Sequence, residues 1–360
     1  MGRVPKEGSL INKQGLTLRT MYWAAEESSS SSSSSSSSKS KSNRRILILV
    51  HGHGAHLEFG ASHVPDGRRA PSQTPLSYPS PVPPVPPVPP VTPYNVELLH
   101  IPSPGAQPTY ENSWAAYFNQ QGIDVCGIDN QGCGGSDALY NIRWYVDRFD
   151  DYVDDVLQYT RHVIDTLPAT ERASAKVYIA GLSLGGCIAL NCVMRDPALF
   201  KRGGLILMAP MISLEKISRR SPNKYMLPIA RLLSYLVPTA PLVATEKNEV
   251  HPEIQEIWDR DPRTSQDAYT RVRSAYEYIT ACDRLMAALR AGGVLEGQRL
   301  LLFHSERDTM VDPEGSEALV ALSASEDMTV RWVNDMWHVL TKEPGCDRVV
   351  REIASWMLAR

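Results

Sequence analysis

The chain has 360 residues, of which 42% are hydrophobic, and this is enough to bury a large core in one or two domains. A formal net charge of -3 excludes the strong basic field of a typical nucleic-acid-binding protein, so we expect no nucleic-acid partner. The six cysteines show no C-x-x-C spacing and several lie in apolar runs, which favours buried, reduced thiols. Without an apolar signal region or a span of 18 apolar residues, the sequence predicts a cytoplasmic protein whose membrane contact is at most peripheral.

The first unit that we expect is a β-hairpin of the fold's core within residues 1–27. Residues 9–12 and 16–23 have the composition of strands, and they flank the polar segment Lys13-Gln14-Gly15. Two such runs joined by a short loop that contains glycine are typical of a hairpin.

Two low-complexity segments interrupt the chain. Eleven consecutive serines occupy 28–38 within a polar loop, 28–43, that has no apolar surface to bury and is expected to be disordered. The longer insertion, 57–109, is expected to be irregular, and its proline-rich part favours the polyproline II conformation. We interpret it as a stiff spacer, and a docking site for a domain that reads polyproline II helices is the alternative.

Between residues 44 and 211, apolar strand patterns alternate with helix patterns, which is typical of a parallel sheet with right-handed crossovers. The run 44–50 is almost continuously apolar, as expected of a strand that is buried on both faces. The other strands expected in this unit are 123–128, 177–180 and 204–208, and the expected helices are 113–121, 149–166 and a stretch that begins at 186.

Residues 212–297 break this alternation with helical patterns interrupted by prolines, and we expect them to form a helical cap. Strand patterns return at 299–303 and 329–333, and a closing helix is expected over 346–359, so that 298–360 completes the core. The predicted fold class is α/β, with a mostly parallel central sheet flanked by helices and a helical cap insertion.

The most informative motif is Gly181-Leu182-Ser183-Leu184-Gly185. It follows the apolar run 177–180 and precedes a helical pattern, so a strand, a sharp turn and a helix meet at one serine. This is the context of a nucleophile elbow, in which small neighbours let the backbone turn tightly and expose the serine Oγ. A glycine-rich turn with a solvated serine is the alternative interpretation.

A serine nucleophile needs a base held by a third group, because a hydroxyl is a weak nucleophile at neutral pH. Where this elbow occurs, an acid and then a histidine follow along the chain, each on a loop after a strand. We therefore predict Ser183 as nucleophile, His338 as base and Asp308 as orienting acid. A core histidine and a loop acid are the alternatives for the last two positions, and the rival acids are Asp312, Glu306 and Asp335.

The segment His51-Gly52-His53-Gly54 follows an early strand and suggests two kinds of site. An oxyanion hole needs one amide from the residue after the nucleophile and one from such a loop, and we predict the amides of Leu184 and His53. The segment also nearly matches the H-x-H-x-D-H run of binuclear metallohydrolases, but Ala55 stands where the carboxylate ligand would be. We therefore expect no metal and no other cofactor.

Together, these motifs resemble the monoacylglycerol lipase and lysophospholipase branch of the α/β-hydrolase superfamily, among the hydrolases of the serine aminopeptidase S33 type. The resemblance covers about 44–56 and 110–357 and rests on His51-Gly52-His53-Gly54, Asp129-x-x-Gly132-x-Gly134-x-Ser136, the elbow with Gly186, and the loops of Asp308 and of Trp337-His338. It implies the α/β-hydrolase fold, the residue roles given above and a helical cap over an acyl pocket. The serine tract and the insertion at 57–109 depart from the family.

The motifs and the resemblance predict a serine esterase that cleaves a monoacylglycerol or a lysophospholipid through an acyl-enzyme. A serine aminopeptidase or a thioesterase is the alternative on the same three residues, and a non-catalytic interaction protein that uses its proline-rich segment is the alternative of another class. The apolar residues 225–237 of the cap are expected to line an acyl tunnel or to contact lipid, although an ordinary buried helix explains them equally well.

Overall fold

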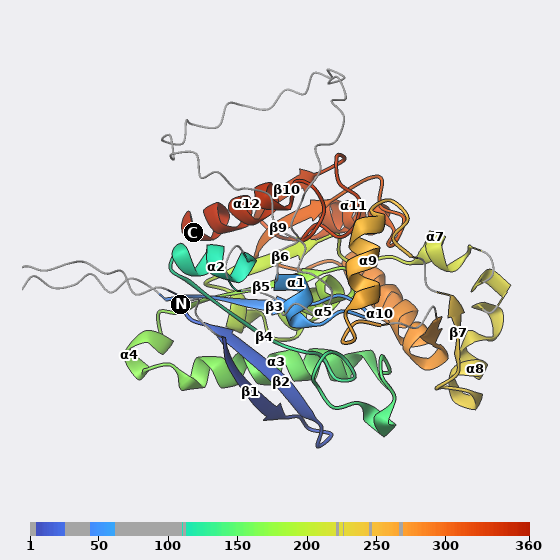
Figure 1. Ribbon diagram of the computed structural model, residues 1–360. Coiled ribbons are helices and arrows are strands. Elements are labelled where there is room, and N and C mark those ends of the chain that lie inside the picture. The colour runs from blue at the N-terminus through green and yellow to red at the C-terminus, as the bar shows by residue number, and fades with distance from the viewer. Residues whose placement is uncertain are drawn as a thin grey trace, which may run out of the picture.

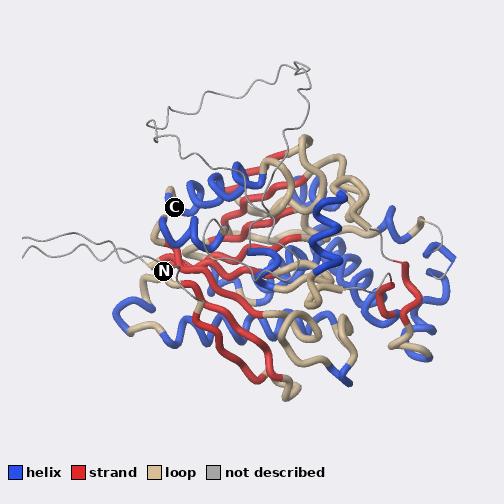
Figure 2. The backbone as a smooth tube through the Cα atoms, in the orientation of Figure 1, coloured by secondary structure: helices blue, strands red, loops and turns tan. Residues whose placement is uncertain are grey.

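The computed structural model describes residues 5–25, 44–61, 110, 113–220, 223–225, 227–244, 247–265 and 269–360. The serine tract and residues 62–109 of the proline-rich insertion lie outside these ranges, and so do the predictions made for them. Figure 2 shows the described residues as one central sheet with helices packed around it.

The central sheet has eight strands in the order β1-β2-β4-β3-β5-β6-β9-β10. At one edge, β1 (Lys6–Ile11) pairs antiparallel with β2 (Thr17–Trp23), which pairs antiparallel with β4 (Ile123–Ile128). All further neighbours are parallel, and these strands are β3 (Arg45–Val50), β5 (Lys176–Leu182), β6 (Gly204–Met208), β9 (Arg299–His304) and β10 (Asp327–Trp332). The predicted α/β class with a mostly parallel sheet is confirmed.

Helices cover both faces of the sheet (Figure 1). The helices of the first face share one apolar cluster with the strands, and they are α3 (Phe149–Thr166), α5 (Leu184–Arg195) and α10 (Val272–Ala291). Those of the second face share another cluster, and they are α2 (Trp114–Gln120) and α12 (Cys346–Leu358). In Figure 1, α12 lies near β10 in the upper part of the view and α3 lies near β1 and β2 in the lower part.

The residue pattern of each element matches the surfaces that it buries. In β3, Ile46 and Ile48 join the first cluster and Leu47 joins the second, because successive side chains of a strand point to opposite faces. In α3, Tyr152 and Val156 lie four residues apart on the helix face that packs against the sheet. This layered core brings the carboxyl ends of the parallel strands to one edge, where the loops that carry the predicted site residues begin.

The predicted cap block, 212–297, contains a pair of strands as well as helices. Its described elements outside α10 are α7 (Glu215–Ser218), η2 (Asn223–Tyr225), η3 (Leu227–Ile229), α8 (Ala230–Leu236), β7 (Pro241–Ala244), α9 (Pro252–Arg260) and β8 (Tyr269–Arg271). β7 and β8 pair antiparallel, and strands this short carry too few residues to show a period in the sequence. α10 closes the block and buries Tyr278, Cys282 and Leu285 in the first core cluster, so it packs with the core.

The insertion expected to be irregular from residue 57 instead begins with a helix, α1 (Leu57–Ala61). Leu57 and Phe59 are buried, and the Leu57 amide donates to Asp129 Oδ1 at 2.8 Å. These contacts to distant residues stabilise a helix that is too short to be recognised from its own sequence. The remaining helices of the described chain are η1 (Leu139–Asn141), α4 (Ala169–Arg172), α6 (Pro197–Phe200) and α11 (Pro313–Leu322).

All six cysteines are buried free thiols. Among the described helices, none combines the length and the apolar character needed to cross a bilayer.

Candidate active site

Ser183 forms the turn between β5 and α5, at the carboxyl edge of the sheet. Its φ of 55° and ψ of -121° lie where L-residues are rarely found, and its amide donates to the Met208 carbonyl at 3.0 Å. A Cβ atom on Gly181 would overlap the carbonyl group of Gly185, and one on Gly185 would overlap the carbonyl oxygen of Val50. The glycines of the motif are therefore required by the close approach of three backbone segments around a strained serine.

His338 and Asp308 meet from the loops that follow β10 and β9. Both side chains are buried, and His338 Nδ1 lies 2.7 Å from Asp308 Oδ2. Burial by itself would raise the pKa of Asp308, but the charge of His338 and hydrogen bonds from His338 and His304 hold this pKa well below its usual range. Burial would lower the pKa of His338, yet Asp308 and, more weakly, Glu343 raise it. The ionised Asp308 can accept the Nδ1–H, which leaves Nε2 as the basic atom of the imidazole.

The rival acids have other partners. Asp312 accepts hydrogen bonds from the backbone amides that open α7. The Asp335 carboxylate pairs with Arg348, at 2.9 Å, and Glu306 bonds to Asn334. Of the four candidate acids, the predicted one is the acid that contacts the imidazole.

The loop after β3 runs beside the nucleophile and carries His53, the predicted source of one oxyanion amide. A Cβ atom built on Gly52 would lie 3.6 Å from the Ser183 Cβ. In the described part of the chain, neither the His53 amide nor the Leu184 amide donates to a protein acceptor. Both amides are thus available to a ligand, as an oxyanion hole requires.

The three histidines of the possible metal motif have separate partners. His51 accepts a hydrogen bond from a backbone amide, His53 lies 3.2 Å from the Tyr278 hydroxyl, and His56 lies 2.7 Å from Asp261. Burial, with a smaller contribution from His51, lowers the pKa of His53 to about 4. Among the described residues, no three or more His, Cys, Asp or Glu side chains gather in a group that could hold a metal ion.

Glu343 is a buried member of the site that sequence reasoning missed. Its carboxylate is fully buried and accepts hydrogen bonds from three consecutive backbone amides, those of Trp337, His338 and Val339. One carboxylate thereby fixes the loop that carries the predicted base. These three partners are backbone atoms, which every residue has, and the fourth partner is His251, whose Nε2 lies 3.8 Å from Glu343 Oε2. The sequence therefore held no pattern by which to recognise the contacts.

His304, the last residue of β9, was also not predicted. Its Nε2 lies 3.1 Å from Asp308 Oδ2 and its Nδ1 lies 2.6 Å from the Ser316 hydroxyl, with the whole side chain buried. It therefore contacts the same carboxylate oxygen of Asp308 that the base contacts. The i, i+4 spacing of His304 and Asp308 was the available signal, but a loop gives that spacing no fixed geometry.

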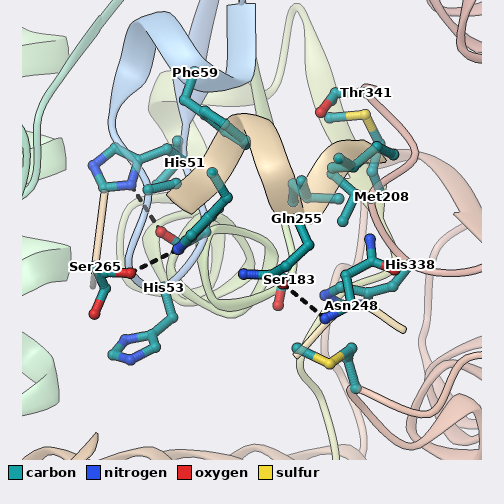
Figure 3. A pocket seen from close by; sticks show the side chains of 18 of the residues that line it. His51, His53, Phe59, Ser183, Met208, Asn248, Gln255, Ser265, His338 and Thr341 are labelled. Carbon is teal, nitrogen blue, oxygen red and sulfur yellow. Dashed lines mark hydrogen bonds between the residues drawn. The ribbon is translucent and has the colours of Figure 1, made fainter. Parts of the chain in front are cut away.

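Two cavities share Ser183, His338 and His53 in their linings. We name them after the helix that lines each, the α9 cavity, which Figure 3 shows, and the α10 cavity. The α9 cavity measures about 220 Å³, and its apolar walls include Leu57, Phe59, Trp114, Ile254 and Trp258. The α10 cavity measures about 260 Å³, and its apolar walls include Leu214, Ile217, Leu227, Val272 and Ile279. Of the apolar cap segment expected to line a tunnel or contact lipid, Leu227 and Ala230 line the α10 cavity. Its exposed large apolar side chains are Tyr225, Ile229, Leu232, Tyr235, Leu236 and Val237.

Comparisons with known proteins agree with this architecture. The family model of the serine aminopeptidases, S33, matches residues 108–345. Human monoglyceride lipase is 26% identical over 250 residues, which cover 66% of this chain and 75% of that protein. The monoacylglycerol lipase of Mycolicibacterium smegmatis is 22% identical over 249 residues, which cover 68% of this chain and 81% of that protein.

Solved structures show the same fold. A soluble variant of monoglyceride lipase from Saccharomyces cerevisiae, in complex with a substrate analogue, has a TM-score of 0.67 at 15% identity and covers 99% of this chain and 95% of its own. The monoacylglycerol lipase of Paleococcus ferrophilus has a TM-score of 0.61 at 15% identity, with coverages of 95% and 98%. At these identities the structures support the arrangement of strands and helices and nothing finer.

Proposed function

The chain belongs to the serine aminopeptidase S33 family of α/β-hydrolases, and on this premise we propose that it is a serine hydrolase of lipid carboxylic esters. The substrate that we propose is a monoacylglycerol or a lysophospholipid. The observation that carries the proposal is the hydrogen bond between His338 and Asp308 beside two apolar cavities, both of which Ser183 and His338 line.

In the proposed reaction, Ser183 Oγ attacks the acyl carbonyl while His338 Nε2 takes its proton. The amides of His53 and Leu184 stabilise the oxyanion, and Asp308 stabilises the imidazolium. His338 then gives its proton to the leaving alcohol as the acyl-enzyme forms. A water molecule repeats the sequence, with His338 as base, and releases the fatty acid and the free serine.

The α10 cavity is the proposed site of the acyl chain. Its walls are mainly apolar side chains of the cap and of α10, and each buried CH₂ contributes about 0.8 kcal/mol. The enzyme should therefore prefer medium or long acyl chains to acetate in a kcat/KM series. A series that is flat or falls from two carbons upward would favour a short-acyl esterase or a peptidase.

The alternatives have less support. An aminopeptidase needs an acidic side chain to pair with the substrate's amino group. Among the described residues that line the two cavities, the one acid is Asp259, and its position is exposed, so it provides no buried partner for an amino group. A thioesterase uses the same three residues, and thioester substrates would separate it. The non-catalytic alternative depends on the proline-rich insertion, which lies mostly outside the described residues.

Peripheral membrane contact through the cap is the proposed way of reaching a lipid substrate. The side chains of Tyr225, Leu232, Tyr235 and Leu236 are 57–70% exposed, and Arg231 lies on the same short helix as three of them. In a flotation assay with anionic vesicles, the wild type should float with the vesicles, and the double variant Leu232→Ser, Leu236→Ser should stay in the unbound fraction. Equal flotation of both proteins would exclude this surface, and location in the cytoplasm stays a prediction from the sequence.

The direct test is labelling of the nucleophile. A fluorophosphonate probe should label the wild type and not Ser183→Ala, and the variant should fold normally while kcat falls by about 10⁶-fold. Substantial ester hydrolysis by the folded variant would overturn the assignment of Ser183.

A further inference from the structure

The leaving-group side of the site can be identified from the loop that carries the base. His338 must protonate the oxygen of the departing alcohol, so the alcohol has to lie beside this loop. Four residues of this loop, Trp337, His338, Val339 and Thr341, line the α9 cavity. Of these four, His338 is the one that also lines the α10 cavity. The α10 cavity also contains Leu184, whose amide faces the acyl carbonyl in the proposed reaction. This arrangement places the departing alcohol in the α9 cavity and the acyl chain in the α10 cavity.

The α9 cavity is more apolar than a glycerol leaving group requires. It extends from Ser183 between α9 and the second face of the sheet, and at about 220 Å³ it is almost as large as the α10 cavity. Phe59, Trp114 and Trp258 form part of its walls. Glycerol carries a hydroxyl on each carbon, so it would leave these walls without an apolar partner.

Three residues that line this cavity have a buried polar atom without a hydrogen-bond partner among the described residues. These atoms are Trp114 Nε1, Asn248 Nδ2 and Thr341 Oγ1, on residues that are 3%, 8% and 4% exposed. The orientation of Asn248 is fixed, because its Oδ1 accepts from the backbone N–H of His251 at 2.8 Å and its own backbone N–H donates to Gln255 Oε1 at 2.8 Å. Figure 3 shows Asn248 and Thr341 in this pocket with His338. Buried polar groups are nearly always paired, so these atoms indicate a ligand that supplies their partner.

The charge of the cavity selects among polar ligands. Asn248 and Thr341 are neutral, and the charged side chains of the described lining, apart from the base itself, are the exposed Lys247 and Asp259, which have opposite signs. A phosphate group would lose its hydration there without gaining a buried cation. A hydroxyl or an ester carbonyl could pair with either neutral group without that cost.

From these observations we infer that the α9 cavity binds an alcohol that carries its own apolar arm and a neutral polar group near the scissile ester. Such an alcohol is a monoacylglycerol released from a diacylglycerol, so the inference keeps the proposed lipid esterase and replaces the monoacylglycerol or lysophospholipid substrate given above with a diacylglycerol. The inference rests on the proposed function, since it assigns the second half of the same site.

The first test varies the alcohol at constant acyl chain. For the wild type, kcat/KM should rise from methyl to butyl to octyl octanoate by at least tenfold in total, within an upper limit of about fourfold per buried CH₂. A flat or falling series overturns the inference. Hydrolysis of p-nitrophenyl octanoate that depends on Ser183 is measured alongside, so that failure of the inference is distinguished from failure of the proposed function.

The second test fills each cavity in turn. Ile254→Trp in the α9 cavity should lower the octyl-to-methyl ratio of kcat/KM about tenfold, and Ala275→Trp in the α10 cavity should instead lower the octanoyl-to-acetyl ratio. The same substitution at the exposed Val250 is the control and should change neither ratio. The assignment of the two cavities would be overturned if Ile254→Trp lowered the octanoyl-to-acetyl ratio and Ala275→Trp lowered the octyl-to-methyl ratio. If Ile254→Trp does not fold, Ile254→Phe provides the same comparison.

The third test addresses the polar groups. Thr341→Val removes the hydroxyl with little change of shape, and it should lower kcat/KM for 1,2-dioctanoylglycerol relative to octyl octanoate by about tenfold, as expected for one lost hydrogen bond. An unchanged ratio would contradict the role of Thr341. A wild-type enzyme that cleaved octanoyl lysophosphatidylcholine faster than dioctanoylglycerol would contradict the exclusion of phosphate.

Discussion

In the proposed mechanism, the acid–base chemistry at the edge of the sheet depends on the carboxylate of Asp308. It touches the imidazole of His338, whereas Asp312 holds the start of α7 and Asp335 pairs with Arg348. Asp308→Asn should keep the fold and reduce kcat by about 10⁴-fold, because an amide cannot hold the tautomer that the base requires. Asp312→Asn and Asp335→Asn, measured in the same assay, should cost far less. If Asp308→Asn lowered kcat only slightly while Asp312→Asn or Asp335→Asn lowered it strongly, the assignment of the acid would be wrong.

Glu343 acts on His338 through the backbone and through its charge. Glu343→Gln keeps the size of the side chain, but it removes a charge that helps to raise the pKa of His338 and places an amide donor against backbone N–H groups. We expect kcat to fall by up to about 10²-fold through misplacement of the base. The imidazolium of His338 loses a stabilising negative charge, so the pKa of His338 should fall. The acidic limb of the pH profile, which is the rise of kcat/KM with pH on its acid side, should therefore move to lower pH.

Two matched variants separate this role from simple destabilisation. Glu343→Asp keeps the charge but shortens its reach, so kcat should fall while the acidic limb moves less. Asp335→Asn removes an exposed carboxylate from the same loop and should leave the limb in place. A Glu343→Gln enzyme with the wild-type pH profile would show that Glu343 only supports the fold.

At the scale of elements, α9 and the segment after it contact the loop that carries His53. The Ser265 amide donates to the Gly54 carbonyl at 2.7 Å, and a Cβ atom on Gly54 would lie 2.7 Å from the Trp258 ring. Gly54 has a φ of 69°, so both its conformation and its packing require glycine. The position of α9 over its cavity is therefore coupled to the loop that carries His53.

The two ends of the serine-rich loop are held by a single buried carboxylate. Asp124 of β4 accepts hydrogen bonds from Tyr22 and the Ala25 amide on one side of the loop and from Arg44 on the other. Because these contacts fix both ends, deletion of 28–38 should shift Tm by no more than about 3 °C and leave kcat unchanged. Asp124→Asn is the informative comparison and should lower Tm more than the deletion does. A deletion that costs more than Asp124→Asn would indicate that the tract itself contributes to stability.

For the whole molecule, buried neutral histidines predict how stability depends on pH. Burial lowers the pKa of His51 and brings that of His53 to about 4, below the unfolded value of about 6.5. Their contribution to stability is present above pH 6.5 and is lost as the pH falls towards 4, because the unfolded chain binds these protons first. Asp308, whose pKa is lowered, loses its contribution only at still lower pH, and His338, whose pKa is raised, loses its contribution as the pH rises.

We therefore expect Tm to decline between pH 6.5 and 4. The variant His53→Asn, which keeps the backbone amide, should show a shallower decline in calorimetric scans at half-unit steps of pH. Identical slopes for the variant and the wild type would show that the His53 side chain does not titrate in this way.

The sequence by itself determined the order of the core elements. β3 and β5 are recognisable because a strand buried on both faces must be apolar along its length, and the turn at Ser183 is recognisable because its backbone crowding admits only glycine at Gly181 and Gly185. The placement of the loops of Ser183, Asp308 and His338 at one edge also follows from the way parallel strands end there. Their catalytic roles stay predictions until the variants are measured.

Only the tertiary structure decided what depends on contacts between distant residues or on backbone atoms. The helix at Leu57, the pairing of β7 with β8 and the hold of Glu343 on three amides have no local signature, since their stability comes from partners elsewhere in the chain. The division of the site into two cavities is a property of the same kind. It arises where the cap, the loop of His53 and the loop of His338 enclose space together, and no single segment of the sequence encodes that space.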